Sequence, residues 1–227
     1  MQNYTFSGLK PIARDFFKNL AKNNNKEWFT ENKTTYENEV REPIKSLVSD
    51  LSKVFFDENI PYIADPKKAL FRINRDIRFS KDKSPYKTNM GAFFPYTLHS
   101  TTTRPVESLG LYFHFEENSC FIAGGIHMPM PPTLKTLRET IADNWKEFEQ
   151  ILNDKTLKKE FPVILNNEKL KNVPRGFAPD HPAAKYLKLK EFGVYCEIDH
   201  KETYTSKFVD LFLKKAKAIE PFLKFFM

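Results

Sequence analysis

The chain has 227 residues, of which 41% are hydrophobic and 29% are charged, and its formal net charge is +7. This composition excludes a disordered tail and a fibrous repeat, and the length predicts a single domain over residues 1–227. The chain contains 22 Phe but only 7 Gly, so we expect a Phe-rich core and no Gly-rich nucleotide loop.

The first quarter of the chain predicts two helices. Apolar residues recur at helical spacing over residues 8–22, which indicates an amphipathic helix. Asn25 is expected to cap a second helix that begins at Lys26 and continues to about residue 56. Pro43 should kink or divide this second helix, because proline lacks the N–H that a helix interior needs.

The segment over residues 69–79 alternates between apolar and polar side chains, which predicts a strand. Arg75 interrupts the alternation, so we expect a bulge or bend near this residue. The apolar face would contain Phe71, Ile73, Ile77 and Phe79, and the polar face would contain Arg72, Asn74, Asp76 and Arg78.

Three further strands are expected around residues 92–97, 109–116 and 120–127, and in the second of them Tyr112, His114 and Glu116 share the polar face. The remaining predicted elements are helices over 132–152 with a break at Asp143-Asn144, a short helix over 155–160, a loop over 172–182, a helix over 182–190, a strand over 191–199 and a helix over 205–226 with a kink at Pro221. This order predicts the α+β class, with a central, mainly antiparallel sheet covered by N-terminal and C-terminal helices.

The positive charge is concentrated in one short segment. Residues 66–90 contain eight basic side chains and two acidic ones, so this segment accounts for most of the net charge. The chain has only eight Arg, and three of them, Arg72, Arg75 and Arg78, lie within seven residues. Arginine offers a planar fork that suits carboxylate or phosphate, so this clustering indicates a site for an anionic group.

In this hypothesis an anionic small molecule is received by the basic side chains, Asp76 orients the guanidinium groups, and Tyr86 donates a hydrogen bond. The basic side chains in question are Arg72, Arg75, Arg78, Lys83 and Lys87. Two alternatives stay open. One is a nucleic-acid or acidic-partner module, and the other is a structural network of Arg and Asp side chains without a ligand.

Residues 72–87 read RINRDIRFSKDKSPYK, and residues 24–29 read NNKEWF. Together with Gly124-Gly125, Met128-Pro129, the segment PRGF over 174–177 and Asp180-His181-Pro182, these motifs resemble a bacterial family of uncharacterised proteins called domain of unknown function 2461. The resemblance covers nearly the whole chain. It implies a bacterial single-domain protein and supports the location of a site, but it implies no activity.

Several residues outside the basic segment could carry chemistry. Arg175 and His181 could add an arginine clamp and a general acid or base, although Asp180 or His181 could instead cap the helix that follows. His114 with Tyr112 offers a second acid–base set, and the alternative is ordinary polarity of an exposed sheet. The candidate proton carriers are therefore His181, His114, Tyr86 and Asp76, and whether the protein is an enzyme stays open.

The sequence contains no recognisable cofactor motif, no paired metal-ligand spacing, no secretory signal and no apolar run long enough to cross a bilayer. Cys120 and Cys196 are expected to be buried free thiols of a cytoplasmic protein, with a disulfide between them as the alternative. Cofactor, substrate, pathway and oligomeric state are left open.

Overall fold

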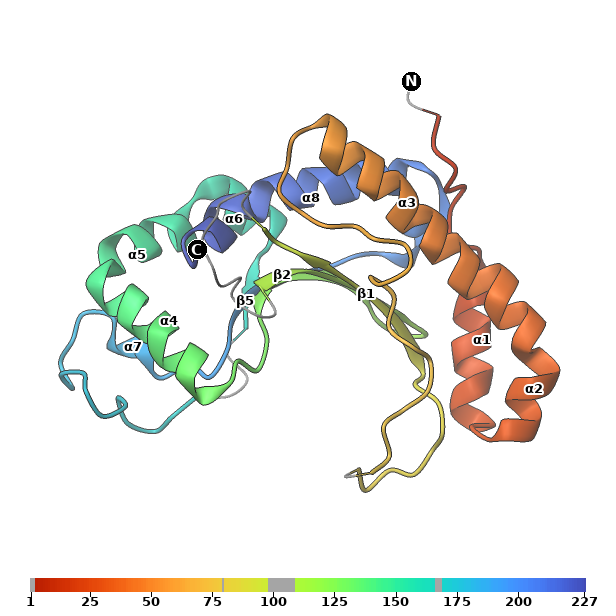
Figure 1. Cartoon of the computed structure of the whole chain (residues 1–227), viewed down its shortest axis with the longest axis horizontal. Coiled ribbons are helices and arrows are strands. Elements are labelled where there is room, and N and C mark those ends of the chain that lie inside the picture. The colour runs from red at the N-terminus through yellow and green to blue at the C-terminus, as the bar shows by residue number, and fades with distance from the viewer. Residues whose placement is uncertain (1–2, 79, 98–108, 166–168) are drawn as a thin grey trace. The chain divides into compact units, whose positions relative to one another are not determined.

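The structure, a computed structural model, describes residues 3–78, 80–97, 109–165 and 169–227 (Figure 1). The chain divides into two compact units, and the sequence passes between them several times. Unit 1 comprises Met1–Phe94, Tyr112–Ile122 and Glu197–Lys214, and unit 2 comprises Pro95–Leu111, Ala123–Cys196 and Lys215–Met227. We describe each unit separately.

The N-terminal helices form as the sequence predicts. They are α1 (Pro11–Lys22), α2 (Lys26–Thr35), the π-helical segment η1 (Tyr36–Arg41) and α3 (Glu42–Asp57). Asn25 caps α2, because its side-chain oxygen accepts a hydrogen bond of 2.9 Å from the backbone N–H of Trp28. The predicted division near Pro43 is present as the π-helical segment that directly precedes α3, whose second residue is Pro43.

The strands form a five-stranded sheet in the order β1-β2-β3-β5-β4. Their bounds are β1 (Asn89–Pro95), β2 (Leu109–Glu116), β3 (Cys120–Ile126), β4 (Val163–Ile164) and β5 (Phe192–Glu197). β4 pairs antiparallel with β5, with Val163 opposite Tyr195. The antiparallel sheet and the helices at both ends of the chain confirm the predicted α+β class, whereas the two-residue strand β4 was not predicted.

The remaining helices are α4 (Pro131–Asp143), α5 (Trp145–Asn153), α6 (Lys155–Glu160), α7 (Ala184–Leu187), the 3-10 helix η2 (His200–Tyr204) and α8 (Lys207–Lys224). The break predicted at Asp143-Asn144 separates α4 from α5. α7 is shorter than predicted, since Leu189 already pairs with Lys169 in an isolated β-bridge. Pro221 lies inside α8.

Phenylalanine side chains fill the core of each unit. In unit 1, Phe113 of β2 is buried with its ring centroid 5.4 Å from that of Phe208. The ring centroids of Phe94 and Phe212 lie 5.1 Å apart. In unit 2, the ring of Phe226 lies 5.8 Å from that of Phe192. These rings are buried, and each buried Phe contributes about 1.5–3 kcal/mol relative to an exposed one.

The prediction of a strand over residues 69–79 is wrong. This segment makes only two isolated bridges among the described residues, Leu70 with Ala92 and Asn74 with Tyr86, so no continuous ladder forms. Of its apolar positions, Ile73 is buried, whereas Phe71 and Ile77 are exposed; Phe79 lies outside the described residues. The alternation of side chains was real, but a strand also needs a neighbouring strand along its whole length.

Candidate functional site

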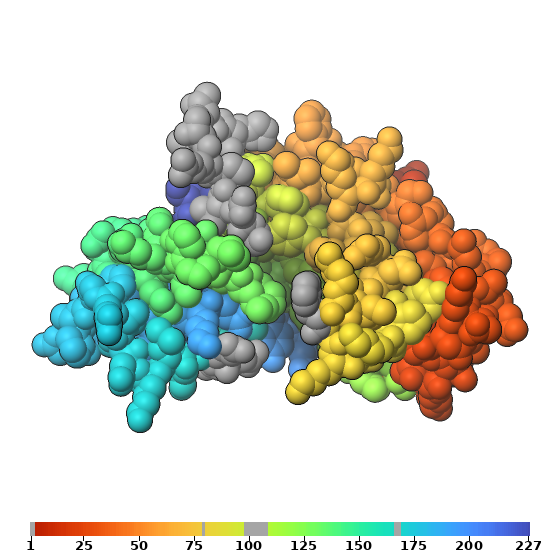
Figure 2. Space-filling model, turned by 60° about the horizontal axis from the view of Figure 1, so that its bottom comes forward, coloured from red at the N-terminus to blue at the C-terminus, as the bar shows by residue number. Residues whose placement is uncertain are grey.

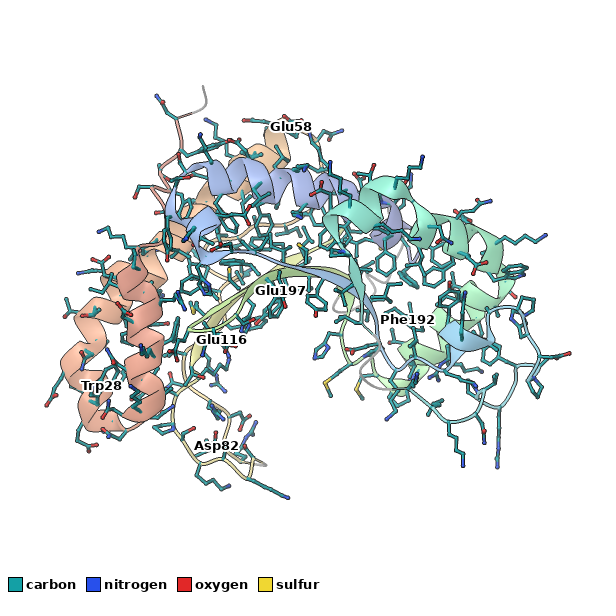
Figure 3. The ribbon with its side chains drawn as sticks, turned by 180° about the vertical axis from the view of Figure 1, so that it is seen from behind. Trp28, Glu58, Asp82, Glu116, Phe192 and Glu197 are labelled. Atoms are coloured by element: carbon teal, nitrogen blue, oxygen red, sulfur yellow. The ribbon has the colours of Figure 1, made fainter. Side chains whose placement is uncertain are left out.

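Residues 70–88 form a long loop that turns back on itself, and we call it the arginine loop (yellow in Figure 1). Its two arms are joined by hydrogen bonds from the Arg75 N–H to the Pro85 carbonyl (2.9 Å) and from the Lys87 N–H to the Ile73 carbonyl (2.8 Å). These bonds place Arg75 and Lys87 at the base of the loop. Figure 3 shows Asp82 at its far end.

Asn24 ties the base of the arginine loop to the turn before α2. Its side-chain amide donates to the Tyr86 carbonyl (2.9 Å), and its oxygen accepts from the Tyr86 N–H (3.1 Å). The Tyr86 ring is buried and stacks on Phe29 at 4.0 Å between ring centroids. Two motifs far apart in the sequence therefore meet here, and the observed contacts of Tyr86 anchor the loop.

The far part of the loop pairs its own charges. Asp76 accepts two hydrogen bonds from the Arg78 guanidinium, at 2.7 and 3.0 Å, and these bonds hold the pKa of the Asp76 carboxyl below its usual value. Asp82 forms an ion pair with Arg75. Lys83 donates to the Ile77 carbonyl at 2.9 Å. Arg78 and Lys83 are therefore engaged by the loop itself.

The base of the loop gathers three cations, Arg72, Arg75 and Lys87, which we call the cation cluster. Lys87 Nζ donates to the Arg72 carbonyl at 3.0 Å. Burial lowers the pKa of Lys87, and the positive charges of Arg72 and Arg75 lower it further. Arg75 Nε is buried without a hydrogen-bond partner among the residues that the structure describes. The cluster therefore carries positive charge that the loop's two carboxylates do not fully compensate.

Tyr112, His114 and Glu116 lie on the polar face of β2, as the alternation predicts, while Phe113 and Phe115 are buried on the opposite face. Figure 3 labels Glu116 on the sheet. The Tyr112 hydroxyl lies 2.9 Å from His114 Nδ1, and His114 Nε2 lies 3.5 Å from the Glu116 carboxylate. We call these three side chains the relay.

Aromatic neighbours hold the relay in place. The His114 ring stacks on Phe121 of β3, with centroids 4.6 Å apart and an angle of 13° between the planes. Burial lowers the pKa of His114, an effect that the Glu116 carboxylate opposes. Burial and the same carboxylate raise the pKa of Tyr112 to about 12. At neutral pH the imidazole is therefore uncharged and the phenol is protonated.

Phe71 lies next to both the cation cluster and the relay. Lys87 Nζ is 5.5 Å from the centroid of the Phe71 ring, and the Tyr112 ring is 6.0 Å from it. The cluster and the relay are therefore neighbours within unit 1. Figure 2 shows the arginine loop, in yellow, at the molecular surface, where Phe71 retains 47% of its exposure.

Arg175, Asp180 and His181 belong to unit 2, whereas the arginine loop belongs to unit 1. His181 Nδ1 accepts a hydrogen bond of 3.0 Å from the backbone N–H of Ala183, just before α7. The N-cap of α7 is Ala183 and no described side chain caps this helix, so the hydrogen bond of His181 belongs to the preceding turn and the predicted cap by Asp180 or His181 does not form. Arg175 and Asp180 are exposed.

Four residues of the site were not among the predicted site residues. Asn24 was visible only as part of the NNKEWF motif, and Phe71 and Phe121 were assigned to strands without a role in a site. Gly91 of β1 leaves the space in which the Tyr112 ring lies, since a Cβ at this position would be 2.6 Å from the Tyr112 hydroxyl oxygen. No local pattern in the sequence indicates that approach.

Three other features bear on the chemistry of the chain. Among the described residues, no three His, Cys, Asp or Glu side chains gather closely enough to hold a metal ion. No helix of the described ranges is long and apolar enough to cross a membrane. Cys120 and Cys196 are both buried and are not joined in a disulfide.

Comparison with known families assigns the chain to a family. Residues 13–225 match the model of a family described as "Conserved hypothetical protein (DUF2461)". The chain belongs to the DUF2461 family. The resemblance is thus confirmed over nearly the whole length, including the arginine loop and the relay. Comparisons with curated proteins and with solved structures find no match.

Proposed function

We propose that this DUF2461 protein binds an anionic small molecule, bearing a phosphate or carboxylate group, at the cation cluster of Arg72, Arg75 and Lys87. One observation carries the proposal. Three cations converge at the base of the loop, while its two carboxylates pair with Arg78 and with Arg75.

The two carboxylates of the loop form their ion pairs with Arg75 and Arg78, although the charge of Arg72 also acts on Asp76 from a distance. Among the described residues, neither Arg72 nor Lys87 forms an ion pair, and Arg75 keeps a buried Nε without a partner. Like charges held this close repel one another, and a bound dianion relieves that repulsion while accepting their hydrogen bonds. The guanidinium of Arg72 is exposed and therefore accessible to a ligand from solvent.

The fixed position of the loop also supports binding. Asn24 and Phe29 hold the base of the loop through Tyr86, so the cations are presented from a positioned backbone. Preorganised donors lose less conformational entropy when a ligand binds. Arg78 and Lys83 support the loop, and Tyr86 anchors it.

Calorimetric titration with inorganic phosphate tests the proposal. Arg72→Ala and Lys87→Ala should each weaken phosphate binding about tenfold, the loss expected when a charge-assisted hydrogen bond is removed. Lys81→Ala is the matched control, because Lys81 is an exposed cation elsewhere in the same loop. Equal weakening by all three substitutions would show a diffuse effect of charge and would contradict a defined site.

A titration with a single-stranded oligonucleotide at two salt concentrations provides a second arm. Oligonucleotide binding that is tighter than phosphate binding and falls steeply with salt would favour a nucleic-acid surface over a small-molecule site. The expected result is phosphate binding with little retention of the oligonucleotide.

Cys120 and Cys196 are buried and are not joined in a disulfide, which fits a protein of a reducing compartment such as the bacterial cytoplasm. A bacterial origin and a cytoplasmic location are part of this proposal.

A further inference from the structure

The hydrogen bonds of the relay on β2 have a defined donor and acceptor at each step. The Glu116 carboxylate can only accept a hydrogen bond, so the facing His114 Nε2 carries the proton. His114 Nδ1 then has a free lone pair, and the Tyr112 hydroxyl donates to it over 2.9 Å. The hydroxyl oxygen of Tyr112 retains lone pairs that can accept a proton from a third group.

We propose that Tyr112 is the acid–base residue of the anion site and that it passes a proton from the bound ligand to His114. This inference rests on the proposed function, because the cation cluster must hold the ligand. It makes the protein an enzyme that deprotonates an O–H group of an anionic substrate or of a water molecule beside it.

The proton transfer balances with the groups present. The O–H bond of the ligand breaks and its proton goes to Tyr112 Oη, while the O–H proton of Tyr112 goes to His114 Nδ1. The electron pair stays on the ligand oxygen, where Arg72 and Lys87 stabilise the new negative charge. His114 becomes an imidazolium ion between Tyr112 and Glu116, and the carboxylate stabilises it.

The position of Phe71 brings the two halves of the site together. Lys87 Nζ and the Tyr112 ring both lie next to this one ring, at 5.5 and 6.0 Å from its centroid. A ligand that is held by Lys87 and rests on the Phe71 ring therefore extends toward the Tyr112 side chain. The exposed surface of Phe71 offers an apolar floor for the rest of the ligand.

The surroundings of His114 suit a proton acceptor. Among the described residues, Tyr112 and Glu116 of its own strand and the uncharged Phe121 of β3 contact His114. Burial keeps the imidazole neutral, so that it has a lone pair available when the ligand arrives. His114 acts through Tyr112 and is a positioning residue.

Gly91 positions the hydroxyl. A Cβ here would lie 2.6 Å from the Tyr112 oxygen and 2.7 Å from a ring carbon, so Gly91→Ala must displace the end of the tyrosine side chain. The variant keeps the phenol but moves it out of line with His114. It therefore tests whether the position of the hydroxyl matters, independently of whether the hydroxyl is present.

The test follows His114 by nuclear magnetic resonance in the full chain labelled with ¹⁵N-histidine, over a range of pH, without and with saturating inorganic phosphate. In the wild type, Nδ1 should be the unprotonated nitrogen at neutral pH. Phosphate should then raise the midpoint of the His114 titration, with a coupling of at least about fivefold in affinity. In Tyr112→Phe, phosphate should still bind but the midpoint should stay in place.

Gly91→Ala should behave as Tyr112→Phe does, and Lys81→Ala should behave as the wild type. Thermal unfolding of each variant checks that it folds. Phosphate binding in the wild type with no movement of the midpoint, or with equal movement in Tyr112→Phe, would overturn the relay and leave the proposed function standing. Failure of phosphate to bind the wild type would overturn both.

Discussion

The arginine loop and the polar face of β2 are neighbours, but different forces build them. The face of β2 follows from regular alternation, with Phe113 and Phe115 buried on one side and Tyr112 and His114 turned to the other. The described residues of the loop form only isolated bridges and depend on a few hydrogen bonds, among them those of Asn24 to Tyr86. Strand geometry places the relay, whereas individual polar contacts place the cations.

This difference teaches which substitutions should act locally. A change in the core under β2 should act on the fold of unit 1 as a whole, because many apolar contacts depend on it. A change in the anchor of the loop should cost less stability and should also weaken anion binding. The following predictions test that separation, beginning with the largest effect.

Phe113→Ala should lower the free energy of unfolding by about 3–5 kcal/mol, the usual cost of removing a buried ring. Phe113 is fully buried and lies against Phe208 and Phe212. Urea unfolding measures the effect. A loss below about 1 kcal/mol would show that the core does not support β2 as described.

Asn24→Ala removes two hydrogen bonds to the backbone of Tyr86 and should cost about 1–3 kcal/mol in stability. It should also weaken phosphate binding, because the base of the loop loses its anchor. Asn23→Ala is the matched control, since Asn23 only donates to the Asn19 carbonyl at an exposed position. If Asn24→Ala left phosphate affinity unchanged, the loop would not need this anchor.

His114 should contribute a pH dependence to stability. Its pKa is lowered in the folded state from the ordinary value of 6.5, so the unfolded chain binds the proton more readily. Stability from this group is full above pH 6.5 and is lost as pH falls through the folded pKa. When the pH is lowered from 7 to 5, the urea midpoint should decrease in the wild type and should decrease less in His114→Gln. Parallel profiles would contradict the burial of a neutral imidazole.

Asp76→Asn should have the smallest effect on folding, because the pair between Asp76 and Arg78 is exposed and such pairs add little. The urea midpoint at neutral pH should be indistinguishable from that of the wild type. The same holds for phosphate affinity if Asp76 serves only to engage Arg78. A marked change in phosphate affinity would place Arg78 in the site and blur the distinction between the two parts of the loop.

Much of the fold followed from local patterns. Periodic apolar residues located α1, α3 and α8, Asn25 marked the start of α2, and alternation located β2 with its polar face. The same alternation failed over residues 69–79, because the described part of this segment makes only isolated bridges, Leu70 with Ala92 and Asn74 with Tyr86, and no continuous ladder. The two-residue strand β4 was missed for the converse reason, since its pairing with β5 leaves no periodic signal.

The sequence by itself determined the α+β class, the family and the concentration of arginine in one segment, because composition, periodicity and motifs are local properties of the chain. Only the tertiary structure decided which charges are compensated and what lies beside them. Asp76 and Asp82 pair within the loop, Asn24 anchors its base, and Phe71 joins Lys87 to Tyr112. These contacts link residues of separate segments, and their distances depend on how the chain packs.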